Sequence, residues 1–340
     1  MNLHVFRLDK FIPPFMAFCR ERLPDHDNYF YVVDNDRDYA YQDGPDSHLQ
    51  TGRLGYLKLF WKMYRARRII LHNLLDKHVV LFLALNPWLL KKCHWVIWGF
   101  DLYLYHQRRK SWKFRANEWL RRIVIKRMGY LITYVPGDVA LARQWYGARG
   151  EHLECIMYPS NVFTPPNLDV ADSRSVTTVQ VGNSADPSNN HFQVFTQLSK
   201  ASPGAYTVLV PLAYGDPAYA RQVSEAGERL FGEAFRPVTG FMPYNDYLSM
   251  LAEIDIAIFA HDRQQAMGNI IALLGMGKTV YLKPEVTSAR FLREQNIVFL
   301  DATRPTLETI SRHDADRNKA LIGSYFSMQR LTTQWQRILD

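Results

Sequence analysis

Cysteine is scarce in this sequence: only three of its 340 residues are Cys. They are widely spaced and form no CxxC pair, which excludes a disulfide framework and a cysteine zinc site; they are Cys19, Cys93 and Cys155. No paired His, Asp or Glu residues stand at metal-ligand spacing, so we expect no bound metal. The sequence also lacks GxxxxGK[ST], GxGxxG and GxSxG, which disfavours P-loop enzymes, ordinary dinucleotide-binding proteins and α/β-hydrolases.

Long apolar runs are missing as well. The best run, residues 79–90, contains Asn86 and Pro87 and is too short to span a bilayer. The N-terminal stretch MNLHVFRLDKF has no basic region followed by an apolar one, so it does not read as a signal peptide. We therefore expect a cytoplasmic protein without a transmembrane helix.

Apolar residues are plentiful but dispersed, and positive charge is concentrated in one half of the chain. A hydrophobic content of 47% with 14% aromatics predicts a chain that is folded throughout, with material for two domains. Residues 1–160 hold 25 Lys and Arg against 15 Asp and Glu, whereas the remainder holds 16 against 18. The basic half is therefore expected to face an anionic partner, either a membrane or a nucleic acid.

Short apolar runs alternate with helical patterns along both halves, which predicts an α/β fold. The stretch YPSNVFTPPNLDVADSRS, residues 158–175, has three prolines and no period. We predict a Rossmann-like domain at 1–160, a linker at 161–175, a second Rossmann-like domain at 176–320, and a final helix within 321–340 that packs back on the first domain. Ligands of such folds bind at the carboxyl ends of the strands.

The loop VGNSADPSNNH, residues 181–191, follows the apolar run 176–180 and precedes a helical pattern. Backbone amides and short polar side chains at a helix N-terminus are typical of phosphate sites. The candidate ligands are Gly182, Asn183, Ser184 and Asn189. The alternative is an ordinary strand-to-helix loop in which Ser188 or Asn189 caps the helix.

A second candidate loop lies in IAIFAHDRQQAMGNIIALLGMGK, residues 256–278. An apolar strand runs into a polar segment, and glycine then opens an apolar helix. Arg263 and the amides of Gly268 and Asn269 suit a diphosphate, with Gln264 and Gln265 between them. The alternative is a capped helix with Arg263 in a surface ion pair.

Two further residues suit a nucleotide-sugar pocket. Glu285, just after the strand at 279–282, could accept hydrogen bonds from ribose hydroxyls, and Tyr244 could flank a base. Alternatively, Glu285 is a solvated charge and Tyr244 belongs to a turn.

In the first half, WVIWGFDLYLY, residues 95–105, places Asp101 just after a strand that ends at Trp98 and Gly99. A carboxylate there, with its pKa raised by aromatic neighbours, could act as a general base toward a sugar hydroxyl. His72, at the end of another strand, is the alternative base. The opposing interpretation is that Asp101 caps a helix and that His72 and the tryptophans are structural.

The stretch HQRRKSWKFRANEWLRRIVIKRM, residues 106–128, carries nine Lys and Arg residues and one Glu. Apolar residues recur there at helical spacing, with Arg115, Arg121, Arg122 and Lys126 elsewhere on the helix. A second stretch, residues 53–68, interleaves basic and aromatic residues in the same way. Because each cation near an anionic leaflet contributes roughly 1 kcal/mol, the two stretches could support reversible membrane attachment. The alternative is an ordinary core-facing helix with solvated charges.

Several ordered stretches resemble a known family. VIWGFDLY, VGNSADPSNNH, VLVPLAYGDPAYARQVSEAGERLF, YLSMLAEIDIAIF, HDRQQAMG and ARFLREQNIVFL are similar to the enterobacterial TDP-4-acetamido-4,6-dideoxygalactose (Fuc4NAc) transferases of glycosyltransferase family 56, which act on lipid-linked sugars. The resemblance spans residues 68–300. The chain departs from the family pattern where Ala266 and Met267 precede Gly268.

This resemblance implies a GT-B glycosyltransferase: two Rossmann-like domains facing a cleft, with a nucleotide sugar bound mainly by the second domain. It implies that no metal or other cofactor is required. The donor phosphates would meet residues 182–184 and the loop at 263–269. The matching first-domain positions are His72, Asp101 and the acceptor-binding residues Trp98, Gly99 and Tyr103.

The resulting hypothesis is a glycosyltransferase on the inner face of the bacterial plasma membrane that moves a Fuc4NAc-like sugar from dTDP to a polyprenyl-diphosphate-linked saccharide. A non-catalytic assembly subunit that binds nucleotide sugars or the membrane is the alternative. A nucleic-acid partner rests only on the sequence pI near 9.3, and we predict none.

Overall fold

Two parallel sheets organise the chain. The computed structural model describes residues 1–34, 41, 43–50, 52–106, 111–165, 176–200, 206–240 and 242–340, apart from the side chains of Arg53, Tyr244 and Asn245. These residues divide into two compact units: unit 1 is Met1–Val162 with Met328–Asp340, and unit 2 is Phe163–Ser327. Residues 166–175 of the expected linker and residues 107–110 of the basic stretch lie outside the described part.

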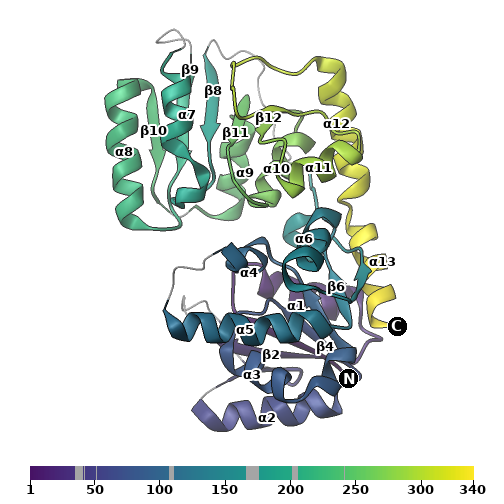
Figure 1. Ribbon diagram of the computed structural model, residues 1–340. Coiled ribbons are helices and arrows are strands. Elements are labelled where there is room, and N and C mark those ends of the chain that lie inside the picture. Colours follow the sequence, from purple (N-terminus) through teal and green to yellow (C-terminus); the bar gives the residue numbers. More distant parts are fainter. Residues whose placement is uncertain are drawn as a thin grey trace. The chain divides into compact units, whose positions relative to one another are not determined.

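Unit 1 contains a seven-stranded parallel sheet in the order β3-β2-β1-β4-β5-β6-β7. Figure 1 labels β2, β4 and β6 of this sheet. Its strands are β1 (Asn2–Arg7), β2 (Asn28–Asp34), β3 (Ser47–Leu49), β4 (Arg68–His72), β5 (Cys93–Val96), β6 (Tyr130–Ile132) and β7 (Glu151–Leu153). Its helices are α1 (Ile12–Arg22), α2 (Gly52–Arg65), α3 (Lys77–Leu85), α4 (Gly99–Leu102), α5 (Trp112–Arg127), α6 (Pro136–Tyr146) and α13 (Met328–Leu339), with 3-10 turns η1 (Pro87–Lys92), η2 (Tyr103–His106) and η3 (Pro159–Asn161).

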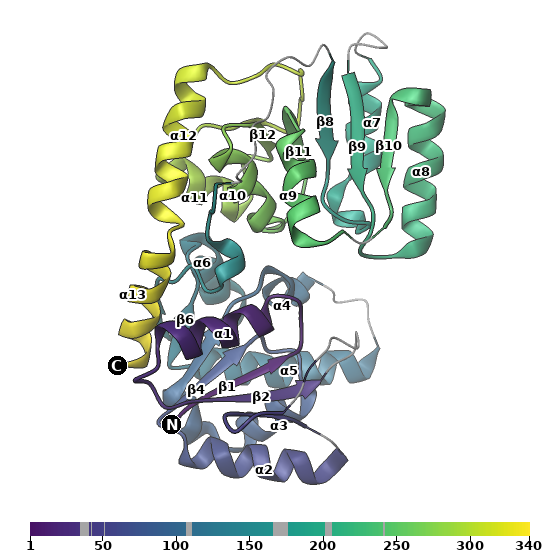
Figure 2. The ribbon, with the colours of Figure 1, turned by 180° about the vertical axis from the view of Figure 1, so that it is seen from behind.

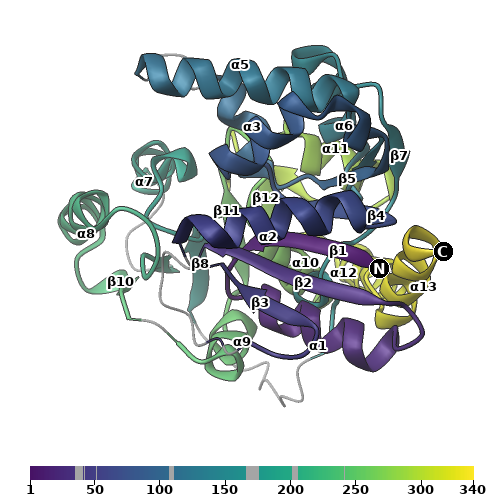
Figure 3. The ribbon, with the colours of Figure 1, turned by 90° about the horizontal axis from the view of Figure 1, so that it is seen from below.

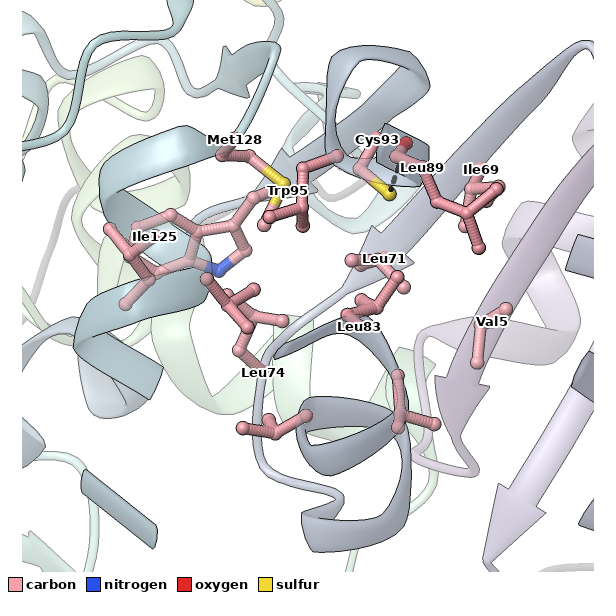
Figure 4. Close-up of a cluster of buried hydrophobic side chains, with 14 of the residues drawn as sticks. Val5, Ile69, Leu71, Leu74, Leu83, Leu89, Cys93, Trp95, Ile125 and Met128 are labelled. Atoms are coloured by element: carbon pink, nitrogen blue, oxygen red, sulfur yellow. Dashed lines mark hydrogen bonds between the residues drawn. The ribbon is translucent and has the colours of Figure 1, made fainter. Parts of the chain in front are cut away.

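Strand alternation gives the unit 1 sheet two different faces. Leu3 and Val5 of β1 and Leu71 of β4 join a buried apolar cluster with side chains from α2, α3, α5 and α6. Figure 4 shows part of it, with Trp95 of β5, Leu83 of α3 and Ile125 of α5. His4 of β1 and His72 of β4 point to the other face, where their rings lie near Phe15 of α1 and Trp335 of α13. One face is therefore an ordinary apolar core, and the other contains buried polar groups.

Unit 2 has a six-stranded parallel sheet in the order β10-β9-β8-β11-β12-β13. Its strands are β8 (Thr177–Val181), β9 (Tyr206–Pro211), β10 (Phe235–Val238), β11 (Ile256–Phe259), β12 (Thr279–Leu282) and β13 (Leu300–Asp301). Its helices are α7 (His191–Leu198), α8 (Pro217–Phe231), α9 (Tyr244–Ala252), α10 (Met267–Gly275), α11 (Thr287–Glu294) and α12 (Arg312–Tyr325), with 3-10 turns η4 (Pro187–Asn189) and η5 (Gly232–Ala234). The two doubly wound α/β sheets confirm the predicted fold class.

The C-terminal region differs from the prediction of one helix in residues 321–340. It forms two helices, α12 in unit 2 and α13 in unit 1, separated at Phe326 and Ser327 (Figure 2). Phe326 is fully buried, and its carbonyl accepts a hydrogen bond from the amide of Phe163 at 2.8 Å. The break gives each helix its own buried stripe; in α13 the stripe is Leu331, Trp335, Ile338 and Leu339.

Helix α13 is fixed to unit 1 by polar contacts as well as by its apolar stripe. Trp335 Nε1 donates to the carbonyl of Met157 at 2.8 Å, and Gln334 Oε1 accepts from the amide of Ile156 at 2.9 Å. Arg330 pairs with Glu154 at 2.7 Å. The first unit ends at Val162 and the second at Ser327, whereas the sequence predicted limits at 160 and 320.

Candidate functional site

The strand order of unit 2 reverses between β8 and β11. From β8 the chain continues to β9 on one side, and from β11 it continues to β12 on the other. Ligands of doubly wound sheets bind at the carboxyl ends of the strands at such a switch point. The loops that begin there are residues 182–190, which lead to α7, and residues 260–266, which lead to α10. They are the two loops that the sequence predicts to bind phosphate.

Asn189 organises the first of these loops. Its fully buried side chain accepts hydrogen bonds at Oδ1 from the amide of Asn183 at 2.9 Å and from His261 Nε2 at 2.8 Å. Its Nδ2 donates to the carbonyl of Asp186 at 3.0 Å and to Ser184 Oγ at 3.3 Å. These contacts occupy both donors and both acceptor positions of the amide. Asn189 therefore supports the loop from beneath, rather than offering its side chain to a ligand as the sequence analysis expected.

Gly182 is required by this arrangement. Its φ is +67°, and a Cβ there would come within 2.7 Å of both Asn189 Oδ1 and His191 Nε2. Asn190, with φ +54°, is the N-cap position of α7 and makes no side-chain cap there. The alternative in which Ser188 or Asn189 caps this helix is therefore wrong.

Side-chain hydrogen bonds join the two loops. Asn190 Nδ2 donates to the carbonyl of Ala260 at 2.7 Å and to Asp262 Oδ2 at 3.0 Å. Gln265 accepts from Ser188 Oγ at 2.8 Å and donates to Asn183 Oδ1 at 3.2 Å. Hydrogen bonds thus cross-link the two loops at the switch point, and Gln265 of the second loop contacts two residues of the first.

The second loop brings positive charge to this structure. Arg263 NH2 lies 3.8 Å from Asp186 Oδ2. Helix α10 begins after Ala266, which has φ +59° and provides no side-chain cap, and its first turn contains Gly268 and Asn269 but no acidic residue. The partial positive charge of the α10 N-terminus therefore lies close in sequence to the guanidinium of Arg263. Together the two positive groups favour the binding of an anion.

The two histidines beneath the loops are neutral. Burial lowers the pKa of His261 to about 3, helped by the positive charge of Arg263, and burial lowers the pKa of His191 to about 4. No local sequence signal marks either residue, because their partners Asn189 and Tyr219 are distant in sequence. His261 therefore links the second loop to Asn189, and His191 contacts Tyr219 of α8, and neither adds charge.

The remaining predicted residues of unit 2 lie near the same edge. Gln264 is half-buried, and its carbonyl accepts from Arg263 at 3.4 Å. Glu285 is exposed in the turn between β12 and α11. Tyr244 begins α9, but its side chain lies outside the described part; Tyr247 in the next turn hydrogen bonds to the side chain of Asn269.

Aromatic residues gather at the carboxyl ends of the unit 1 strands. Trp98 follows β5 and is half-buried, and its Nε1 donates to Tyr158 Oη at 2.9 Å. The ring of Phe11, just before α1, has its centroid 4.8 Å from those of both Trp98 and Tyr158. Gly99 is buried at the start of α4, and Tyr103 packs edge-on against Trp145 of α6.

Asp101, which was predicted to act as a general base toward a sugar hydroxyl, is fully buried. Its Oδ2 accepts from Trp95 Nε1 at 2.7 Å and from the amide of Leu74 at 3.0 Å. Burial raises its pKa to about 6, although the positive charge of Arg121 opposes the shift. Arg121 is itself fully buried, where it donates to the carbonyls of Leu74 and Asp101 and to the carboxylate of Glu118. It is therefore not one of the cations that α5 could offer to a membrane. In this geometry Asp101 holds the fold of unit 1 together.

His72, the alternative base, is also fully buried. Its Nε2 lies 3.0 Å from His4 Nδ1, and its Nδ1 lies 2.7 Å from Tyr158 Oη. Both ring nitrogens therefore have protein partners, and burial lowers the pKa of His72 well below its ordinary value. Neither predicted base is exposed to solvent.

None of the helices in the described part of the chain has both the length and the apolar character that a membrane span needs. No group of three or more His, Cys, Asp or Glu side chains in the described ranges is placed to hold a metal ion.

The family model of the 4-alpha-L-fucosyltransferases, glycosyl transferase group 56, matches residues 24–340. The chain belongs to this family. The match confirms the resemblance seen in the ordered motifs and makes this protein a glycosyltransferase.

Solved structures of similar shape include that of Anabaena HepE in complex with UDP and glucose, at 14% identity and a TM-score of 0.70 over 100% of this chain and 99% of that one. Sucrose-phosphate synthase from Thermosynechococcus elongatus is 12% identical, with a TM-score of 0.66 over 99% and 98%. WaaG, a glycosyltransferase involved in lipopolysaccharide biosynthesis, is 11% identical, with a TM-score of 0.60 over 100% and 94%. At these identities the likeness establishes the fold, which is GT-B.

Proposed function

We propose that this glycosyltransferase moves a Fuc4NAc-like deoxy-amino sugar from a dTDP-sugar to a hydroxyl of a polyprenyl-diphosphate-linked saccharide, in the synthesis of a bacterial surface polysaccharide. The observation that carries the proposal is the cross-linked pair of loops at the unit 2 switch point, with Arg263 and the uncapped start of α10 beside them. The similar HepE structure contains UDP and glucose, which supports a nucleotide sugar as donor. The choice of dTDP and of the sugar follows the resemblance of the motifs.

The unit 2 site suits the leaving group of such a transfer. The bond between the anomeric carbon and the diphosphate oxygen breaks, a bond to the acceptor oxygen forms, and the acceptor hydroxyl loses its proton. dTDP leaves with the negative charge, which Arg263 and the first amides of α10 would stabilise. This arrangement supplies in fixed form the positive charge that a bound Mg²⁺ provides in other transferases, so we propose transfer without a metal. We assign the proton acceptor to neither Asp101 nor His72, because both are buried.

The acceptor saccharide is proposed to bind unit 1 at the half-buried rings of Trp98 and Phe11. Flat aromatic surfaces can stack on sugar rings. These rings lie at the carboxyl ends of the strands, the edge at which doubly wound folds bind ligands.

The outer surface of unit 1 supports attachment to an anionic membrane. Helices α2, α3 and α5 lie side by side on one face of the sheet, as Figure 3 shows, and Phe60 of α2 stacks on Phe82 of α3 with ring centroids 3.9 Å apart. Large apolar side chains project from this layer. We call them the tryptophan face: Leu54, Leu57, Trp61, Leu85, Trp88, Trp112 and Trp119, which are between 56% and 78% exposed.

Cations accompany the tryptophan face. Arg65 lies over the ring of Trp61 at 4.7 Å, and other exposed cations of the layer are Lys58, Lys113, Arg115, Arg122 and Lys126. Tryptophan favours the interface between headgroups and acyl chains, and each cation contributes roughly 1 kcal/mol near an anionic leaflet. We propose that this face attaches the enzyme to the cytoplasmic leaflet of the inner membrane, where lipid-linked saccharides are found.

A thermal-shift screen of the purified protein against dTDP, UDP, GDP, CMP and ADP tests the donor assignment. We expect dTDP to raise the unfolding temperature most, and to do so equally with Mg²⁺ and with a chelator. Stronger stabilisation by another nucleotide would refute the dTDP assignment, and loss of the effect on chelation would refute metal independence.

A further inference from the structure

A continuous chain of hydrogen bonds runs through the buried face of the unit 1 sheet to Trp98. Trp98 Nε1 meets Tyr158 Oη at 2.9 Å, and Tyr158 Oη meets His72 Nδ1 at 2.7 Å. His72 Nε2 meets His4 Nδ1 at 3.0 Å, and His4 Nε2 meets Asn28 Oδ1 at 3.3 Å. The chain connects strands β1, β2 and β4 with the segments that follow β5 and β7.

The two ends of this chain fix the direction of every hydrogen bond in it. The indole N–H of Trp98 can only donate, so Tyr158 accepts from it and gives its own proton to His72 Nδ1. His72 then carries its proton on Nε2 and donates to His4 Nδ1, and His4 in turn donates through Nε2–H to the side-chain oxygen Oδ1 of Asn28. The opposite direction would leave the Tyr158 proton unpaired and place two acceptors opposite each other at Asn28.

The surroundings keep the two histidines neutral and ordered. His4, His72 and Tyr158 are buried among Phe15, Trp335 and their neighbours, with ring centroids 4.9 to 6.1 Å apart. Burial lowers the pKa of His4 to about 3 and raises the pKa of Tyr158. Neutral polar groups are costly in a core unless each one is paired, and here each one is.

We propose that His4, His72 and Tyr158 are positioning residues that hold the Trp98 indole in one orientation for the acceptor sugar. This inference rests on the proposed function, in which Trp98 contacts the acceptor. The only polar atom of the Trp98 side chain is committed to Tyr158, and Phe11 meets the ring edge-on at an interplanar angle of 73°, so the indole plane is fixed on two sides. A ring held in this way can stack on a sugar without first losing rotational freedom.

The variant Tyr158→Phe tests the inference by removing one hydroxyl from the middle of the chain. Loss of one buried hydrogen bond weakens binding by about three- to tenfold. We expect the KM for a short-chain polyprenyl-diphosphate-linked disaccharide to rise by that factor, with kcat and dTDP affinity nearly unchanged. Tyr31→Phe is the matched control, because Tyr31 is equally buried in unit 1 and donates to the carbonyl of Gly55 at 2.7 Å. Its acceptor KM should stay at the wild-type value.

A measurement on the wild-type protein tests the direction of the chain without any variant. Long-range ¹H–¹⁵N spectra of histidine-labelled protein should show both His4 and His72 as neutral Nε2–H tautomers between pH 5.5 and 8. An Nδ1–H tautomer at His72 would overturn the inference, as would an unchanged acceptor KM in an active, folded Tyr158→Phe. Those results leave the proposed function intact, whereas a wild-type enzyme that transfers no sugar would refute the proposed function and this inference together.

Discussion

Asn189 Oδ1 lies so close beneath Gly182 that a Cβ on residue 182 would approach it to 2.7 Å. The same oxygen accepts hydrogen bonds from the amide of Asn183 and from His261. One side chain therefore sets the path of the first loop and ties it to the second. The short polar side chains and glycine of VGNSADPSNNH are explained by this packing, since any larger residue at Gly182 would displace the amide that supports the loop.

The variant Gly182→Ala should be destabilised and should bind donor poorly. An alanine with left-handed φ costs about 1–2 kcal/mol, and the collision with Asn189 adds to this. Gly323→Ala is the matched control: nothing lies within 4 Å of a Cβ there, and alanine in a helix is favoured over glycine by about 1 kcal/mol. Urea unfolding and dTDP calorimetry measure both variants. A Gly182→Ala protein as stable as wild type would contradict the packing described here.

The variant Arg263→Ala should weaken dTDP binding by about 10- to 100-fold, the loss expected for a hydrogen bond to a charged group. Arg229→Ala removes the same charge from the last turn of α8, at the opposite edge of the unit 2 sheet, and should leave the affinity unchanged. Isothermal titration calorimetry compares the two variants with wild type. Equal affinity in Arg263→Ala would remove this residue from the site.

The positions of strands could be predicted from the sequence where the strands are buried and apolar. The apolar run 176–180 falls on β8, and the strand expected at 279–282 coincides with β12. Strands β3 and β7 have only three residues each and polar sequences, SHL and EHL, so no apolar run marks them. The break between α12 and α13 was not predicted because neither proline nor glycine stands at Phe326 and Ser327. Phe326 is fully buried at the break.

The two loops of unit 2 could be found from the sequence because glycine, asparagine and short polar residues after a strand are a local signal. The first-unit residues could not be assigned in the same way. Whether a side chain at a strand end points to solvent or into a core depends on the parity of the strand and on the helices that cover it. His72 points toward α1 and α13, and the buried partner of Asp101 is Arg121, twenty residues away.

The variant Asp101→Asn should remain active within a few-fold of wild type, because the carboxylate is buried against Leu74 and Trp95. Removal of a true general base lowers turnover by about 10²- to 10⁴-fold. Steady-state kinetics at saturating donor decide between the two roles, and circular dichroism checks that the variant is folded. A turnover loss of a hundredfold in a folded variant would restore Asp101 as the base.

Asp101 should also make the stability of unit 1 depend on pH. Its pKa is raised from 3.8 to about 6 in the folded protein, so folding disfavours the charged form. Its contribution to stability is therefore largest below pH 4, falls as the pH rises from 4 to 6, and stays low above pH 6. The change amounts to at most about 3 kcal/mol. The difference in unfolding free energy between wild type and Asp101→Asn should follow this decline, and a difference that is constant between pH 4 and 7.5 would contradict it.

The tryptophan face should determine membrane attachment. The triple variant Arg115→Glu, Arg122→Glu and Lys126→Glu reverses three exposed charges of α5, and each cation contributes roughly 1 kcal/mol near an anionic leaflet. Flotation with vesicles containing phosphatidylglycerol should therefore recover wild type but little of this variant. High salt, which screens exposed charges, should also prevent the wild-type protein from floating with the vesicles. The double variant Trp61→Ala and Trp119→Ala should also float less well than wild type, even at low salt. This variant removes apolar surface from the membrane interface and leaves the charges in place.

A control must show that the effect belongs to this face and not to net charge. Reversing Arg221 and Arg229, which are exposed on α8 of unit 2, changes the charge of the whole protein in the same direction but leaves the tryptophan face intact. That variant should float like wild type. The α5 and tryptophan variants should keep the dTDP affinity of wild type, because their substitutions lie in unit 1 and the donor loops lie in unit 2. If the α8 variant floated as poorly as the α5 variant, general electrostatic attraction would explain the binding. The tryptophan face would then not be the attachment surface.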